Sequence, residues 1–139
     1  QETVIRWEID EVSKLTEEWR ESPIKFVSGL PWRLSVKKEC SEKTGYVPYL
    51  AVFLRCNDES DCELWRMEHE SKMVLVHRKD PQKSLMGTIL KPFSKNDTDW
   101  GNDKAIEFAE LLDPSKGFIK DDRIIIEAHI EVKSVSGVR

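Results

Sequence analysis

The sequence lacks a long apolar run, because no stretch approaches the roughly 20 apolar residues that a membrane-spanning helix needs. It also lacks an excess of positive charge: 22 lysines and arginines are mixed with 26 aspartates and glutamates, and the formal net charge is −4. A nucleic-acid-binding surface needs a basic cluster, which is missing. With 139 residues, the chain is therefore predicted to be one globular domain that binds neither membrane nor nucleic acid.

Cysteine is scarce, with only Cys40, Cys56 and Cys62, and the odd, irregular set does not predict a disulfide framework. Half-buried or buried thiols in a reducing compartment, the cytoplasm or the nucleus, are the favoured interpretation. Two alternatives stay open. Cys56 and Cys62 flank the polar stretch NDESD and could form a disulfide across a hairpin, or the thiols could bind zinc with His69 and His77, although the spacing matches no structural zinc pattern.

Catalytic motifs are also missing, because the chain contains no glycine-rich phosphate loop, nucleophile elbow or metal-binding motif. Carboxylates in turn contexts, such as Asp97 and Asp121, usually bond to local backbone. The histidines fall in segments with strand character. We therefore expect a non-catalytic domain without a cofactor or metal.

Alternating apolar and polar residues, typical of half-buried strands, dominate what is present. Residues 49–56, YLAVFLRC, are apolar on both faces, which predicts a central strand. Residues 62–69 and 72–79 are expected to form a hairpin around the polar joint Glu70-Ser71. Together, the strand segments predict an all-β fold, an antiparallel β-sandwich of about seven to eight strands. Their ranges are 4–12, 22–29, 31–38, 49–56, 62–69, 72–79, 88–94 and 121–132.

One short helix is expected after a Trp-Gly corner in the stretch DTDWGNDKAIEFAELLD, residues 97–113. Asn102 or Asp103 can cap its N-terminus. Ala105, Ile106, Ala109 and Leu112 share one face at helical spacing. The helix should end at Asp113, because the residue before a proline is pushed out of the α region.

Five tryptophans are candidates for core or binding residues. Trp7 and Trp32 alternate with charged residues on predicted strands, so they are expected in the core. Trp19 lies in a charged stretch and is expected to cover an edge of the sandwich. For Trp65, the pattern allows either a core or an exposed position. Trp100 is expected either to border a groove or to pack under the helix.

The order of several short motifs resembles that of a MATH (meprin and TRAF homology) domain, a TRAF-like β-sandwich, over nearly the whole chain. These motifs are RWEIDEVSKL, YLAVFLRC, DWG, ELLD and GFIKDDRIIIEAHIEV. The resemblance implies a domain that binds short extended peptides of partner proteins. One branch of the family joins this domain to a BTB domain in substrate adaptors of cullin-RING ubiquitin ligases. Other members are deubiquitinases or receptor-signalling adaptors.

The resemblance also implies a peptide-binding groove. Lys91 and Asn102 stand where the adaptor branch has aromatic residues, so the groove should be more polar here. An extended peptide can add to a sheet edge by main-chain hydrogen bonds, and rigid aromatic side chains offer contact area at low entropic cost. The implied peptide-binding residues are Tyr49, Trp65, Met67, Lys91, Phe93, Asp99, Trp100, Gly101 and Asn102.

We therefore expect a substrate-recognition domain of a BTB-containing adaptor that reaches a cullin-RING ligase through its separate BTB domain. The alternatives are an oligomerising signalling-adaptor domain and a targeting domain of a deubiquitinase. No heptad pattern precedes Trp7, so the isolated domain is expected to be a monomer. Because the sequence does not begin with Met, we expect a piece of a longer protein, with the domain at 1–133 and the start of a linker at 134–139.

Overall fold

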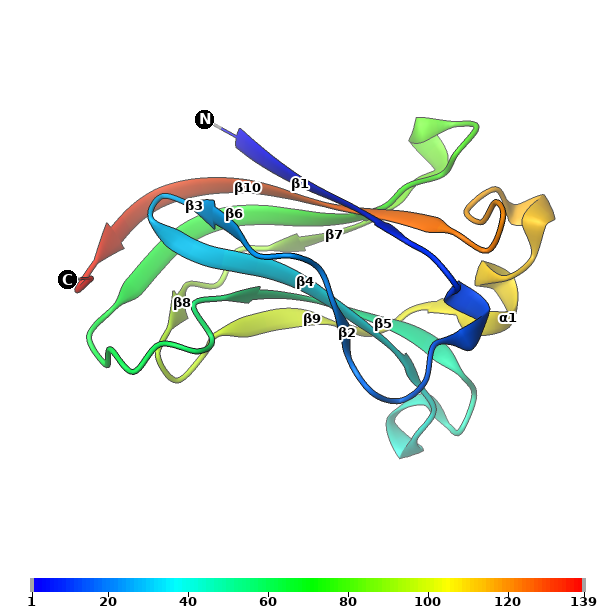
Figure 1. Ribbon diagram of the computed structural model, residues 1–139, viewed down its shortest axis with the longest axis horizontal. Helices are drawn as coiled ribbons and strands as arrows, with labels where there is room; N and C mark the ends of the chain where they lie inside the picture. The colour runs from blue at the N-terminus through cyan, green and yellow to red at the C-terminus, as the bar shows by residue number, and fades with distance from the viewer. Residues whose placement is uncertain (1, 139) are drawn as a thin grey trace.

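The computed structural model describes residues 2–138 and shows two antiparallel β-sheets packed face to face (Figure 1). The predicted all-β sandwich is confirmed. Its one α-helix, α1 (Phe108–Leu111), is a single turn after the last strand of the second sheet. In the described residues, no helix is long and apolar enough to span a membrane.

Sheet A brings the two ends of the described chain together, because its first and last strands pair along their length. The strand order is β1-β10-β6-β7, and β8 also pairs with β6. Its strands are β1 (Glu2–Ile9), β6 (Arg66–Leu75), β7 (Leu85–Ile89), β8 (Phe93–Ser94) and β10 (Ile124–Ser136).

Sheet B has the order β2-β4-β5-β9, and β3 pairs with the start of β4 on the same side as β2, which pairs further along it. Its strands are β2 (Arg20–Glu21), β3 (Lys25–Val27), β4 (Leu30–Glu39), β5 (Tyr49–Cys56) and β9 (Asp99–Glu107). Short 3-10 turns lie between strands at η1 (Val12–Lys14), η2 (Glu42–Thr44), η3 (Pro81–Lys83) and η4 (Pro114–Lys116).

The core lies between the sheets and is built from alternate residues of each strand. On β4 and β5, the paired residues Leu34 and Leu54 are both fully buried. Ile124 and Ile126 of β10 fill the opposite layer. Trp32 is fully buried as expected, whereas Trp7 is half-buried and packs against the edge of this core.

The expected hairpin around Glu70-Ser71 is wrong, because β6 runs through both residues without a turn. Ser71 pairs with Ile130 on one side and Ile89 on the other. Its hydroxyl lies 2.8 Å from Nδ1 of the buried His69, so the two polar side chains pair within the apolar core, while Nε2 of His69 has no hydrogen-bond partner there. Two adjacent polar residues can therefore stay in a central strand.

The predicted start of the helix at Asn102 or Asp103 is also wrong, because Asp99–Glu107 form strand β9 and the Trp-Gly pair lies inside it. Ile106 pairs with Leu50 and Asn102 with Val52. Pairing with β5 satisfies the main-chain groups of these residues and overrides their helical spacing. The helix is thus confined to Phe108–Leu111.

The last strand continues into the segment where we expected a linker to begin. Ser134 and Ser136 still pair with Glu68 and Arg66 of β6, after a register shift that follows Val132. The domain boundary at residue 133 remains a prediction.

Candidate functional site

Strand β9 is an edge of sheet B, since it pairs with β5 on one side only. The Cys56 amide donates to the Thr98 carbonyl at 2.9 Å, and the Phe108 amide donates to the Pro48 carbonyl at 2.9 Å. Because hydrogen-bonded and non-hydrogen-bonded pairs alternate, the main-chain groups of Asp99 and Gly101 point away from β5. These two residues therefore present free hydrogen-bonding groups at the edge.

A bulge limits the regular part of this edge. The register shifts so that the segment between Asn102 and Ile106 stands opposite the single residue Ala51. Within it, the Lys104 amide donates to the Asn102 side-chain oxygen at 2.8 Å. Since a bulge disrupts the ladder, only residues 99–102 offer a regular strand for pairing.

Trp100 lies on the inner side of this edge, and its side chain is not packed under the helix. It is 47% exposed, and the Lys91 ammonium lies 4.6 Å from the centre of its ring. Lys91 also forms an ion pair with Asp97. The indole is thus held by a cation–π contact while one face stays open to solvent.

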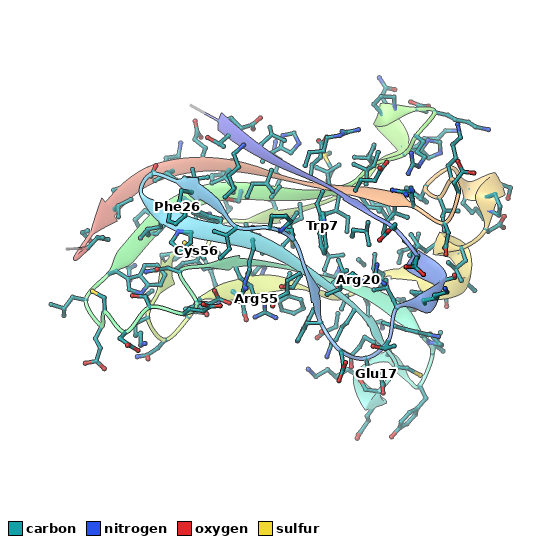
Figure 2. All side chains as sticks on the ribbon, in the orientation of Figure 1. Trp7, Glu17, Arg20, Phe26, Arg55 and Cys56 are labelled. Carbon is teal, nitrogen blue, oxygen red and sulfur yellow. The ribbon has the colours of Figure 1, made fainter. Side chains whose placement is uncertain are left out.

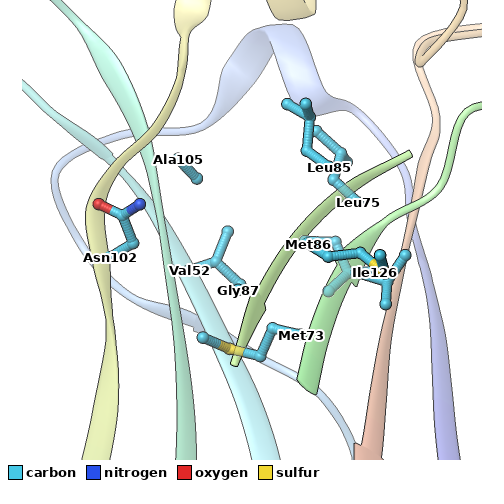
Figure 3. Close-up of a pocket in the computed structure, with 10 residues that line it drawn as sticks. Val52, Met73, Leu75, Leu85, Met86, Gly87, Asn102, Ala105 and Ile126 are labelled. Atoms are coloured by element: carbon cyan, nitrogen blue, oxygen red, sulfur yellow. The ribbon is translucent and has the colours of Figure 1, made fainter. Parts of the chain in front are cut away.

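Next to Asn102, which follows Trp100 on the same side of β9, an apolar cavity of about 80 Å³ opens between the edge strands β7 and β9 (Figure 3). Asn102 and Ala105 border it from β9, and Leu85 and Met86 face them from β7. Its floor is core: Val52, Met73, Val74, Leu75 and Ile126. No charged side chain is among its lining residues, so the cavity suits an apolar group.

The outer side of the edge is polar. The Arg55 guanidinium donates to the Asp99 carboxylate at 2.7 Å and to the Ser35 hydroxyl at 2.8 Å. It also stacks over the Trp19 ring, 4.8 Å from the ring centre, so Trp19 lies on the outer face of the sheet and not at the sandwich edge where we expected it. Asp99 is therefore fixed in place and already carries a positive partner.

Gly101 allows a close approach of strands rather than a positive φ angle. A Cβ atom at this position would lie 2.2 Å from the Val52 carbonyl oxygen and 2.5 Å from the Phe53 ring. The Phe53 side chain packs directly over the main chain of Gly101, and Trp19 packs on Phe53 with its ring centre 5.3 Å away. Any larger residue here would displace this stack.

Tyr49 does not lie beside Trp100. It pairs with Glu107, beyond the bulge, and its half-buried ring lies 5.3 Å below the Lys104 ammonium. Along β5, Tyr49 is separated from Arg55, the partner of Asp99, by about 20 Å at about 3.3 Å per residue. It therefore borders the far end of β9 on the outer face.

Three of the expected groove residues are in the core. Trp65 is 1% exposed, and Met67 and Phe93, which pair with each other, are fully buried. The Phe93 ring stacks on His69 at 4.5 Å. In this conformation their side chains offer no surface to a ligand, and they lie behind the site instead.

Other reactive groups do not form a second centre. Cys40, Cys56 and Cys62 are all free thiols, so the alternative Cys56–Cys62 disulfide is not formed. Burial raises the pKa of the Cys56 thiol to about 12, which leaves it protonated and unreactive. Among residues 2–138, no group of three or more histidine, cysteine or acidic side chains is placed to hold a metal ion.

Sequence reasoning missed the contribution of β7, because SLMG reads as a turn although Leu85–Gly87 are strand. Met86, 69% exposed, and Leu85 form one wall of the cavity. It also missed Arg55. The alternation of YLAVFLRC, which places Phe53 and Arg55 on the face opposite to Leu54, was the available signal.

Comparison with known proteins extends these observations. The sequence profile of the MATH domain family matches residues 4–130. The chain is 25% identical over 118 residues to "BTB and MATH domain-containing protein 38" of Caenorhabditis elegans, covering 85% of this chain and 30% of that protein. It is 28% identical over 138 residues to "Ubiquitin carboxyl-terminal hydrolase 7" of Drosophila melanogaster, covering 99% of this chain and 12% of that protein.

A further relative is "MATH domain and coiled-coil domain-containing protein At3g58260" of Arabidopsis thaliana. It is 26% identical over 133 residues, covering 94% of this chain and 41% of that protein. The chain thus spans less than half the length of each of these relatives.

Proposed function

The chain belongs to the MATH domain family of protein-interaction domains, and from this premise we propose that it binds short extended peptides of partner proteins along the free edge of β9. The observation that carries this proposal is that free main-chain groups and an apolar cavity lie close together on β9. Asp99 and Gly101 direct main-chain donors and acceptors outward, and the next residue of the strand, Asn102, borders an apolar cavity. Peptide addition to a sheet edge uses such a combination.

Side chains of a bound strand would alternate between the inner and the outer side of the β9 edge. Peptide side chains on the inner side face Trp100 and the cavity, whereas those on the outer side face the Asp99–Arg55 pair. A 150 Å³ cavity binds benzene, so a cavity of about 80 Å³ suits a smaller aliphatic side chain. Outer positions suit a hydroxyl or amide that can hydrogen-bond to Asp99.

The proposed site accordingly has three parts. Lys91, Asp99, Trp100, Gly101 and Asn102 contact the peptide. Tyr49 extends the outer face toward the end of β9. The buried residues Trp65, Met67 and Phe93 support the site from the core rather than touch the peptide.

In the whole protein, we propose that this domain selects substrates for a cullin-RING ubiquitin ligase, which it would reach through a separate BTB domain. The relative from Caenorhabditis elegans, whose name joins BTB and MATH domains, supports this assignment. Such a protein would act in the cytoplasm or the nucleus. The three free thiols fit a reducing compartment.

A targeting domain of a deubiquitinase is the second candidate, since the Drosophila relative is a ubiquitin hydrolase and matches 99% of this chain. The full-length protein discriminates between the two. An adaptor should co-purify with a cullin and lack hydrolase activity on a ubiquitin fluorogenic substrate. A deubiquitinase should hydrolyse that substrate.

Selection from a random peptide display library tests the binding site. Selected peptides should bind the wild-type domain with a Kd of about micromolar, as transient contacts often do. Trp100→Ala should weaken binding about tenfold or more, because exposed aromatic residues beside a pocket are frequent hot spots. Phe26→Ser is the matched control: its ring is 69% exposed on the opposite edge of sheet B.

Circular dichroism should show that both variants are folded. If a folded Trp100→Ala domain keeps full affinity for every selected peptide, the site lies elsewhere. Equal losses in Trp100→Ala and Phe26→Ser would also contradict the proposal.

A further inference from the structure

A second apolar surface lies at the other edge of sheet B, on the β3–β4 hairpin (Figure 2). Phe26 is 69% exposed and Ile24 is 49% exposed, whereas Val27 and Leu30 on the opposite face are buried. Phe26 stands opposite Pro31 in the strand pair, so these apolar groups share one face. The surface does not overlap the β9 edge.

The hairpin is a rigid platform for these side chains. Its turn residues Ser28 and Gly29 have φ angles of 53° and 80°, as a two-residue type I′ turn requires. Trp32 of β4 donates from its indole nitrogen to the Val27 carbonyl at 3.2 Å and ties the hairpin to the core. Phe26 is therefore exposed by a well-paired strand and not by a loose loop.

Acidic side chains border this surface on one side. The Arg33 guanidinium contacts three carboxylates: Glu21 at 3.0 Å, Asp58 at 3.0 Å and Glu59 at 3.3 Å. Arg55 also lies 3.9 Å from Glu21 and pairs with Asp99, so two positive charges stand against four negative charges and an excess of negative charge remains. Asp61 and Glu63 of the same loop are exposed and add to it.

An open pocket of about 240 Å³ joins the apolar and the acidic parts. Ile24 and Pro31 form its apolar side, and its polar side is formed by Asn57, Asp58, Glu59 and Arg33, whose guanidinium pairs with the two carboxylates. The Asn57 amide donates to the Pro31 carbonyl at 2.8 Å, which holds the acidic loop against the hairpin. The pocket can thus take an apolar side chain while its rim attracts a cation.

We propose that this hairpin face, defined by Ile24, Phe26, Pro31, Asp58 and Glu59, docks a basic amphipathic segment of a partner protein. An apolar side chain of the segment enters the pocket beside Ile24 and packs on Phe26, while its arginine or lysine side chains pair with Asp58 and Glu59. The excess negative charge disfavours acidic peptides, nucleic acid and anionic lipid surfaces.

The hairpin face is independent of the β9 edge. Strands β4 and β5 separate β3 from β9, which places the two surfaces about 14 Å apart across the sheet at about 4.8 Å per strand. A peptide at one edge leaves the other edge free, so the domain can hold two partners at once.

Titration of the ¹⁵N-labelled domain with a synthetic octapeptide of alternating arginine and leucine tests this inference. We expect amide shift changes confined to residues 24–33 and 57–61. A glutamate-leucine octapeptide is the matched control and should cause none. Raising the ionic strength from about 0.05 M to 0.5 M should weaken binding several-fold, because exposed charges are screened.

Variants then separate the contributions. Phe26→Ser should reduce affinity for the arginine-leucine peptide about tenfold, and Glu59→Gln should reduce it about threefold. Trp100→Ala should leave it unchanged. Because these side chains are exposed, the variants should keep the wild-type circular dichroism spectrum.

Four results would overturn the inference: shifts centred on β9, full affinity in folded Phe26→Ser, equal binding of the glutamate-leucine peptide, or wild-type self-association that Phe26→Ser abolishes. The last result would assign the face to a second copy of the chain. Apart from shifts centred on β9, these results do not bear on binding at β9, which the selected peptides test separately.

Discussion

At the scale of single residues, His69 is a polar side chain enclosed by aromatic rings. Its imidazole is 4% exposed, stacks on Phe93 and meets Trp32 edge-on at 5.5 Å. Burial lowers the pKa of His69 below its ordinary value, so the folded protein holds this residue neutral. The unfolded chain has no such constraint.

This difference predicts a loss of stability in mild acid. Below about pH 6.5 the unfolded chain gains a proton at His69 and the folded chain does not, so the free energy of unfolding falls by up to about 1.4 kcal/mol per pH unit. Urea denaturation of wild type and His69→Gln between pH 5 and 7.5 measures this fall in the free energy of unfolding. The variant should show the smaller decline between pH 6.5 and 5.

His129 supplies the matched control, because its contribution has the opposite sign. Burial alone lowers the pKa of His129, but hydrogen bonds to Glu127 and Glu2 outweigh this and raise it. Its stabilising contribution is thus present below about pH 6.5 and is lost as the pH rises through the raised pKa. His129→Gln should therefore steepen the acid-side decline. Identical slopes in all three proteins would refute both assignments.

The tryptophans show what residue type alone leaves undecided. Trp65 lies between Leu64 and Arg66 and is 1% exposed, whereas Trp100 lies in the polar stretch 97–103 and is 47% exposed. Trp100 shares its side of the sheet with the buried Leu54 but lies on the edge strand, where the opposite layer no longer covers it. Strand order in the sheet decides this difference, and strand order is a property of distant residues.

At the scale of elements, β9 is asymmetric along its two sides. The amides of Trp100 and Asn102 point to β5, whereas those of Asp99 and Gly101 point to solvent. We expect the first pair to exchange slowly with deuterium and the second pair rapidly. Nuclear magnetic resonance resolves these four amides individually.

A peptide selected for β9 should slow exchange at Asp99 and Gly101 while leaving the bulged residue Lys104 fast. The arginine-leucine octapeptide should change none of the four rates and is the control. Slow exchange at Asp99 and Gly101 in the free domain would mean that the edge is already covered.

Prediction of the elements succeeded where local pattern and tertiary environment agree. Strand β5 was predicted with its exact bounds, Tyr49–Cys56, because it is apolar on both faces and lies centrally. It failed at β6, where the His69–Ser71 hydrogen bond makes a polar stretch compatible with the core. It failed again at β9, where Ile106 fits a strand and a helix pattern equally well and the partner strand decides.

At the scale of the whole molecule, each of the two proposed surfaces presents only a few exposed apolar side chains. Met86 and Trp100 lie at the β9 side, and Phe26 and Ile24 lie at the hairpin. A standard stable interface buries about 800 Å² and about 20–30 residues on each partner, more than the few apolar residues named at either surface. Neither proposed surface therefore supports the alternative of an oligomerising domain.

We accordingly expect the isolated domain to sediment as a monomer of 16.2 kDa. Analytical ultracentrifugation at 10 to about 100 μM, a range around the micromolar affinities of transient contacts, measures the mass. A concentration-independent trimer would favour the signalling-adaptor alternative over a substrate-recognition domain. Phe26→Ser and Trp100→Ala, run in parallel, would locate any contact that forms.

The pairing of β1 with β10 sets the order in which the sandwich can assemble. Ile9 pairs with Ile124, so β1, the first strand of the domain to be translated, cannot pair until β10, the last, has been made. Meanwhile β4 and β5 are close in sequence and can pair early, whereas closing so long a loop is slow. On the ribosome, Ile5 and Ile9 therefore remain accessible to chaperones until nearly all of the domain has emerged.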